Sequence, residues 1–141
     1  MEHKAYCCAS FCISSKTITA QEIMNHITIE PTEVAEKGTL LSKRNPKSKR
    51  RDTSFWTLDS QLRGEEPLDL QIENLISLIE VDIDALNKIA SDCHFEIYCS
   101  YFFEYPNSNG MISFDSNLLK RLTAIPIDIA ISLYPAEPDE E

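Results

Sequence analysis

Glycine and long apolar runs are both scarce in this sequence. Only three of its 141 residues are glycine, so no glycine-rich loop is available to wrap a phosphate group with backbone amides. No apolar run approaches the roughly 20 residues that a membrane-spanning helix needs, and no charged-then-apolar leader opens the chain. We therefore expect a cytoplasmic protein that neither spans nor binds a membrane.

Recognisable catalytic patterns are missing as well. The sequence contains no nucleophile elbow. Its close acid pairs, Glu65 with Glu66 and Asp82 with Asp84, are typical of solvated surface carboxylates. We expect a protein without enzymatic activity and without a cofactor.

Five cysteines are present, an odd number, in a chain with no sign of export, so we expect reduced thiols rather than disulfides. The spacing of Cys8 and Cys12 can bind metal on a turn or helix, but on a strand that rises about 3.3 Å per residue they stand about 13 Å apart. One zinc ion could not reach both, so we predict small sheet residues and no metal site. Because metal ligands can converge from distant segments, a site formed by Cys93, His94 and Cys99 stays an alternative.

The charge balance is strongly acidic. The formal net charge of −10 and the pI of about 4.7 disfavour binding to nucleic acid or to an anionic membrane, both of which would repel the protein. A basic or neutral protein partner is more compatible. The length suits a single domain over residues 1–135, which can bury about 68–70% of its unfolded surface. Residues 136–141, with Pro138 and four acids, are predicted to form a disordered acidic tail.

One segment departs from this acidic character. Residues 37–53 contain almost nothing to bury and are predicted to form a mobile basic loop. No aromatic residue is interleaved there to stack on nucleic-acid bases, so we interpret it as a solvated loop lying against the acidic body; the alternative is a patch that binds phosphate or nucleic acid. Six positive charges fall within nine residues of this segment: Lys43, Arg44, Lys47, Lys49, Arg50 and Arg51.

Alternation of apolar and polar residues predicts the strands of a sheet. In segment 55–60, which holds the only tryptophan, Trp56 and Leu58 alternate with Thr57 and Asp59, so we expect Trp56 to be mostly buried. Further strands are predicted over 6–15, 95–104 and 127–134, with a short edge strand or turn beginning at Glu30-Pro31 and an antiparallel hairpin that brings Ile112 and Phe114 back beside 95–104.

Capping residues and apolar residues three or four positions apart predict the helices. Thr19 caps a short helix, Leu68 begins the longest one, Asp82 caps another after a bend near Val81, and Asp115 or Ser116 caps the last. These elements predict an α+β fold: a two-layer sandwich in which three or four helices cover one face of a mostly antiparallel sheet of four to six strands.

Several short stretches resemble a known family. They are Phe-Cys-Ile-Ser-Ser at 11–15, Ile-Glu-Pro-Thr-Glu at 29–33, Trp-Thr-Leu-Asp-Ser at 56–60 and Leu-Leu-Lys-Arg-Leu at 118–122. With the order Pro31, Gly38, Trp56 as its most specific part, the chain from about Ala9 to Tyr134 is similar to an uncharacterised bacterial family, domain of unknown function 4279. The resemblance supports the predicted architecture and implies no activity or site residue.

The face of the sheet that the helices leave uncovered is predicted to carry small and aromatic residues, among them Tyr98, Phe102 and Tyr134. Such a face can bind another protein or a second copy of the chain. With the acidic charge, it favours a protein-interaction module of the immunity or antitoxin kind, which sequesters a basic partner. The alternative is a small-ligand or anion-binding protein in which residues 43–51 fold over an anion beside Trp56.

Overall fold

A computed structural model describes residues 6–104 and 111–136, which form five strands and four helices. The strands are β1 (Tyr6–Ser15), β2 (Glu33–Ala35), β3 (Ser54–Asp59), β4 (His94–Glu104) and β5 (Ile127–Ala136). The helices are α1 (Ala20–His26), α2 (Leu68–Ile79), α3 (Ile83–Ile89) and α4 (Ser116–Leu122), with single 3₁₀ turns at Glu80–Asp82 and Ala90–Asp92.

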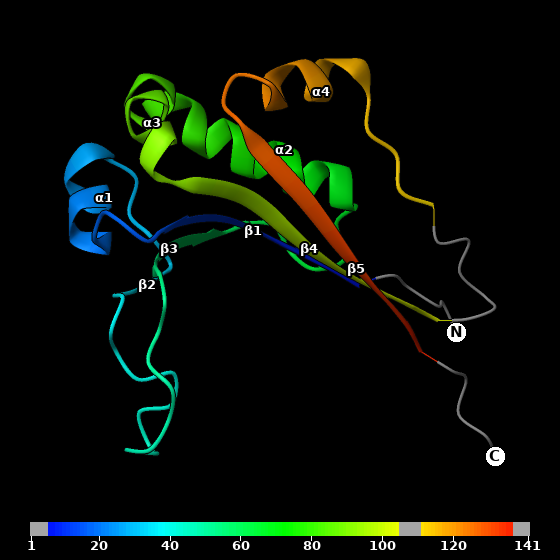
Figure 1. Cartoon of the computed structure of the whole chain (residues 1–141). Helices are drawn as coiled ribbons and strands as arrows, with labels where there is room; N and C mark the ends of the chain where they lie inside the picture. The colour runs from blue at the N-terminus through cyan, green and yellow to red at the C-terminus, as the bar shows by residue number, and fades with distance from the viewer. Residues whose placement is uncertain (1–5, 105–110, 137–141) are drawn as a thin grey trace, which may run out of the picture.

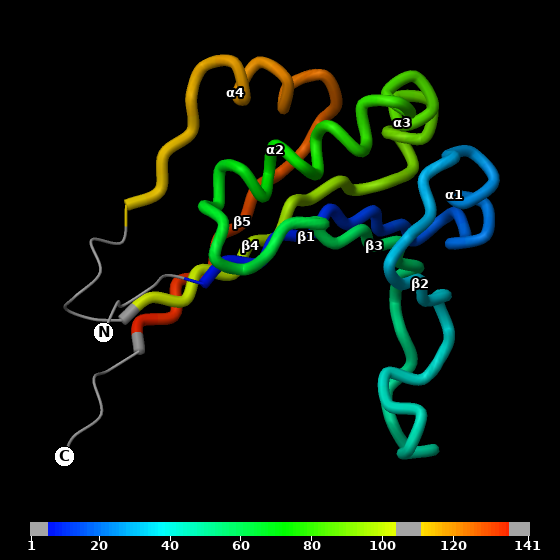
Figure 2. The backbone as a smooth tube through the Cα atoms, turned by 180° about the vertical axis from the view of Figure 1, so that it is seen from behind, coloured from blue at the N-terminus to red at the C-terminus, as the bar shows by residue number. Residues whose placement is uncertain are grey.

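The strands form one sheet in the order β2-β3-β1-β4-β5, with the helices on one face (Figure 1). Every neighbouring pair is antiparallel except β4 and β5, which run parallel. A parallel pair needs a crossover connection, and α4 lies within it. The view from behind shows the same two layers (Figure 2). The predicted α+β fold, with a mostly antiparallel sheet, is confirmed.

The predicted hairpin after β4 is wrong. Residues 111–115 contain no strand, and the partner of β4 on that side is β5. Ile112 and Phe114 are nevertheless partly buried against the core, so their alternation reflects packing of an extended segment rather than pairing in the sheet. Most of the predicted turn, at residues 105–110, lies outside the described residues.

The core is centred on three aromatic rings from three adjacent strands. Phe11 on β1 lies between Trp56 on β3 and Phe95 on β4, with ring centroids 6.2 and 5.9 Å away. All three side chains are buried, and the predicted apolar stripe of α2 is buried above the sheet. The indole N–H of Trp56 makes no hydrogen bond, so this residue stabilises the fold by packing alone.

Two of the predicted helix caps are present, and a third residue has a different role. Thr19 accepts a hydrogen bond from the backbone N–H of Glu22 at 3.0 Å, and Asp115 accepts one from Leu118 at 2.8 Å. Asp82 stands at the N-cap position of α3, but its carboxylate caps nothing there and is buried. The predictions that it caps α3 and that it is solvated are therefore both wrong.

The carboxylate of Asp82 instead holds the exit of α1. Its Oδ2 accepts hydrogen bonds from the backbone N–H groups of Thr28 at 3.0 Å and Ile29 at 3.2 Å, and from the Thr28 hydroxyl at 3.0 Å. These donors lie just after α1 ends, where they have no helical partner. Asp82 therefore ties the end of α1 to the break between α2 and α3.

Among the residues that the structure describes, no helix is long and apolar enough to cross a membrane.

We expect Trp56→Ala to lower the free energy of unfolding by about 3–5 kcal/mol, because it removes the largest fully buried side chain and leaves a cavity. Urea unfolding followed by circular dichroism measures this without the tryptophan signal. Leu41→Ala, at a side chain in the loop that is 54% exposed, is the control and should change stability by less than about 0.5 kcal/mol. A loss below about 1 kcal/mol for Trp56→Ala would contradict its place in the core.

We expect Asp82→Ala to cost about 1–3 kcal/mol, since it leaves two partly buried backbone N–H groups without their acceptor. Hydrogen exchange should quicken at the amides of Thr28 and Ile29, the two groups that lose their partner. Asp84→Ala removes an exposed carboxylate two residues away and serves as the matched control. Equal effects of the two substitutions would show that Asp82 contributes only charge.

Candidate functional site

The outer face of the sheet, opposite the helices, is not covered by any described helix (Figure 1). We call it the open face, and it consists of the outward-pointing residues of the five strands. Strand register arranges these residues in rows that run across the sheet. The rows differ in chemistry from one end of the strands to the other, so the two ends of the face would contact different groups on a partner.

An aromatic row crosses the end of the face formed by the start of β1 and the end of β4. Tyr6, Phe102 and Tyr134 are direct cross-strand neighbours on β1, β4 and β5. The rings of Phe102 and Tyr134 stack with centroids 4.7 Å apart, and Tyr6 meets Phe102 edge-on at 6.3 Å. Their residues are 41 to 50% exposed, which leaves much of this aromatic surface available for contact.

Small and polar residues occupy the middle of the face. Cys8, Ser100 and Ser132 form one row. Ser10 lies in the next row and its hydroxyl donates to the carboxylate of Asp59 at 2.6 Å. The hydroxyls of Tyr98 and Ser132 are 2.8 Å apart, and this hydrogen bond is the main cause that lowers the pKa of Tyr98. Apart from Tyr98 and Asp59, the side chains in this part of the face are short.

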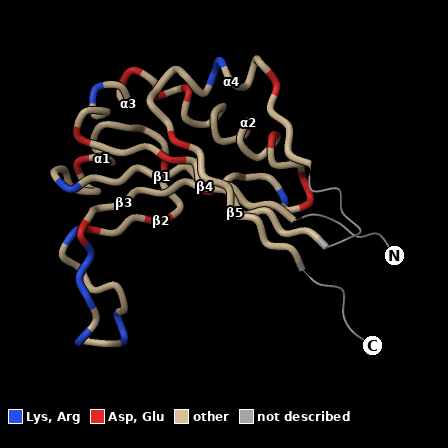
Figure 3. Tube along the Cα trace, turned by 45° about the vertical axis from the view of Figure 1, so that its right-hand side comes forward, with Lys and Arg blue, Asp and Glu red and all other residues tan. Residues whose placement is uncertain are grey.

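An acidic row lies farther along the strands. Glu33, Glu96 and Asp128 occupy the same row on β2, β4 and β5, and Asp59 stands one row away on β3. The imidazole Nε2 of His94 is 3.5 Å from Asp128 and 3.8 Å from Glu96. No described residue of the open face is a lysine or arginine, and the strands in Figure 3 carry acidic residues without basic ones. The acidic residues of the open face are therefore not balanced by any described lysine or arginine there.

The predicted basic loop projects away from the body on the side of the open face (Figures 1 and 3). We call residues 36–53 the basic arm. Gly38 has a φ of 88°, which favours glycine, and its N–H donates to the carbonyl of Arg51 at 2.9 Å. Leu40 and Arg50 form an isolated antiparallel bridge farther out. The expectation that this loop lies against the acidic body is wrong, whereas its mobility stays a prediction.

The cations of the basic arm are available for binding. None of them makes an ion pair with a described carboxylate, and the guanidinium of Arg50 donates to the carbonyl of Gly38 at 2.7 Å. All are exposed except Arg51, which is half-buried. The six predicted residues, Lys43, Arg44, Lys47, Lys49, Arg50 and Arg51, thus lie together on one projection.

Trp56 does not join these cations. Its side chain is fully buried on the helix-covered face, whereas the basic arm extends on the opposite side. Trp56 is buried as expected, which corrects its inclusion among the binding residues, because the indole cannot contact a ligand there. An anion held between the arm and this tryptophan has no site.

The cysteines lie on both faces of the sheet, and none forms a disulfide. Burial raises the pKa of Cys99 to about 12 and that of Cys93 to about 11, and it also raises the pKa of Cys7 and Cys12. Within residues 6–104 and 111–136, no three side chains of the metal-binding types converge on a common point. The structure does not bring Cys93, His94 and Cys99 together as metal ligands.

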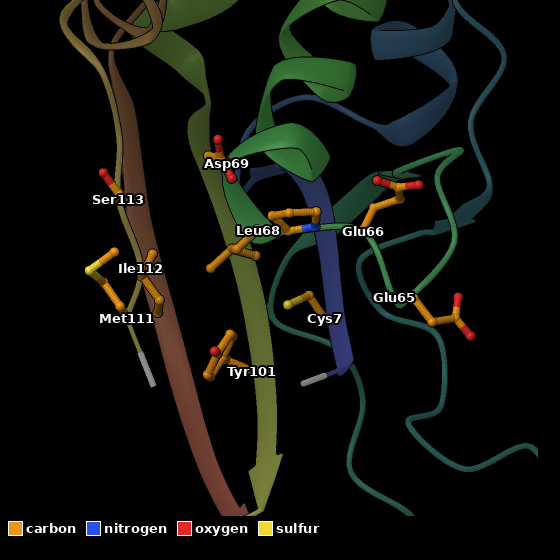
Figure 4. Close-up of a pocket in the computed structure, with 10 residues that line it drawn as sticks. Cys7, Glu65, Glu66, Leu68, Asp69, Tyr101, Met111, Ile112 and Ser113 are labelled. Atoms are coloured by element: carbon orange, nitrogen blue, oxygen red, sulfur yellow. The ribbon is translucent and has the colours of Figure 1, made fainter. Parts of the chain in front are cut away.

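A hollow of about 430 Å³ opens on the helix side near the start of α2. Figure 4 shows Tyr101, Leu68 and Ile112 around it, with Asp69 at one end. The ionised groups on its lining are all acidic, so the hollow suits a neutral or cationic group and would repel an anion. This hollow was not predicted, since its walls come from segments far apart in the sequence.

The structure brings only some of the predicted site residues close together. Phe102 and Tyr134 stack, and Tyr98 lies on the same face two rows away, beyond the row of Ser100 and Ser132. The sequence reasoning did not include Glu96 and Asp128 among the site residues, although strand alternation places both on the outer face. What it lacked was the strand order, which makes these two acids neighbours.

Comparison with protein families identifies the family of the chain. The family model described as "Domain of unknown function (DUF4279)" matches residues 3–136. No curated protein and no solved structure matches the chain.

We expect iodoacetamide at pH 8 to modify Cys8 first and Cys99 last. Cys8 is exposed, whereas burial keeps Cys99 in the unreactive thiol form up to a pH near its pKa of about 12. Peptide mapping by mass spectrometry follows each site, and unfolding in urea should make all five react alike. Equal labelling of Cys8 and Cys99 in the folded protein would contradict their placement.

Proposed function

The chain belongs to the family of domain of unknown function 4279, and we propose that it is a protein-interaction module whose open face binds a basic protein. The observation that carries this proposal is the one-sided charge of that face: acids lie in neighbouring rows, with no described lysine or arginine among them. A surface exposed only to solvent more commonly mixes both signs of charge. A face of one sign, beside a row of exposed aromatic rings, suits a partner of opposite charge.

The aromatic row supports binding to a protein rather than to a small cation from solution. Tyrosine and phenylalanine are enriched at the centres of protein interfaces, where they bury a large area at low entropic cost. Tyr6, Phe102 and Tyr134 already contact one another, so little ordering would be required on binding. We expect them to meet an apolar patch on the partner while Glu96 and Asp128 meet its lysines or arginines.

The basic arm would orient the partner. It leaves the end of the open face opposite the aromatic row and projects on the same side (Figure 1). A partner bound to the acidic rows would therefore have the basic arm at one side. An acidic segment of the partner would complement the charge of the arm there. Opposite charges at known positions fix the orientation of a complex more than they raise its affinity.

The net charge of −10 supports fast association with a basic partner. These properties fit an immunity-like or antitoxin-like role, in which a small acidic protein sequesters a basic toxin. The anion-binding alternative has less support, because Trp56 and the arm lie on opposite faces.

We expect reversal of charge on the open face to weaken binding of the partner. The face variant is Glu33→Lys with Asp128→Lys, and the matched control is Glu22→Lys with Asp84→Lys, on the helix side. All four residues are exposed, and both variants change the net charge equally. The immobilised proteins are incubated with lysate of the source cell, and retained proteins are identified by mass spectrometry.

The retained protein is then purified and titrated by calorimetry. The proposal predicts a basic partner, binding that weakens as salt rises, and at least about a tenfold loss of affinity in the face variant only. An equal loss of affinity in the control variant would show that binding depends only on the net charge of the chain. Capture of nothing at either low or moderate salt, or only of acidic proteins, would overturn the proposal.

A further inference from the structure

The sheet has one long edge without a partner. β5 pairs with β4 on one side, and no described strand pairs with its other side. The opposite edge of the sheet, β2, is only three residues long, whereas β5 is ten. A long edge presents a row of backbone N–H and C=O groups that can pair with another strand, and proteins usually block such edges with charge or short length. Along β5 only Asp128 is charged.

The helical layer leaves the inner face of β5 partly uncovered. Ile129 is 37% exposed and Leu133 is 57% exposed, although both point to the side of the helices. Between β5 and α4 lies a hollow of about 630 Å³, lined by residues that include Leu119, Leu122 and Ile129. Exposed backbone and exposed apolar side chains thus lie along the same edge.

We propose that two copies of this chain pair through β5, antiparallel and centred near Ile131, as a two-fold symmetric dimer. In this register Ile129 of one copy faces Leu133 of the other, on the inner side of the sheet. Leu133 would then reach the mouth of the hollow beside Ile129, where apolar surface is exposed. The two sheets would join into one sheet of ten strands, with both open faces on the same side.

The charges along β5 permit a second copy at this edge. In the proposed register Asp128 faces Tyr134, so the two Asp128 carboxylates do not oppose each other. Ala130 faces Ser132 on the outer side, which adds no steric conflict. Pro135 has no backbone N–H, so the pairing would span roughly residues 128–134. A dimer through the open faces is disfavoured, since acidic rows would then face each other.

This dimer does not rest on the proposed function. The dimer uses the backbone edge of β5 with Ile129 and Leu133 on its inner side, whereas the basic partner contacts side chains that point outward, so a basic partner could bind each copy of the dimer. Failure of the dimer would leave the binding of a basic protein untouched, and absence of that partner would leave the dimer untouched.

Charge substitutions at the two facing residues test the register. One variant carries Ile129→Lys with Leu133→Lys, and a second carries Ile129→Glu with Leu133→Glu. Both residues are partly exposed in the single chain, so each variant should fold, which circular dichroism checks. Val81→Lys, at a helix-side residue that is 74% exposed, is the control.

Sedimentation equilibrium of each purified protein measures self-association. The wild type and Val81→Lys should form dimers, and each double variant should dissociate at least about tenfold more readily, because like charges would face each other across the strands. Mixing the lysine and glutamate variants should restore a dimer containing one of each. A monomeric wild type, a dimer unaffected by both double variants, or no association in the mixture would overturn the proposal.

Discussion

The packing of Phe11 between Trp56 and Phe95 is the contact on which the rest of the structure depends. β1 is the central strand of the sheet, and these three rings join it to both of its neighbours. The apolar stripe of α2 covers them on one side only. Because all helices lie on that side, the other face of the same strands remains in water, and its residues are not constrained by the core.

One-sided coverage gives the molecule three surfaces of different character. The open face is acidic with an aromatic row, the basic arm is cationic and projects beside it, and the edge of β5 is nearly neutral and partly apolar. Surfaces that differ in charge select different partners. A basic protein on the open face and a second copy at the β5 edge are therefore compatible in one assembly.

Local sequence patterns predicted most of the fold, because alternation and capping act within a few residues of one another. The inner residues of β1, the stripe of α2 and the Thr19 cap all have such local causes. These local patterns could not predict contacts between segments that are distant in the sequence. The bond from Thr28 to Asp82 spans 54 residues, and the row that joins Glu96 to Asp128 depends on β5 pairing parallel to β4. The exposed residues of the site could thus be placed on a face, but their neighbours could not.

Oxidative footprinting of the complex tests the central claim most directly. Hydroxyl radicals modify exposed aromatic and aliphatic side chains, and mass spectrometry reports the extent at each residue with and without the purified partner. Binding through the open face predicts protection of Tyr6, Phe102 and Tyr134, with Val81 on the helix side modified to the same extent in both states. Protection of Val81 while the aromatic row stays fully reactive would contradict the account.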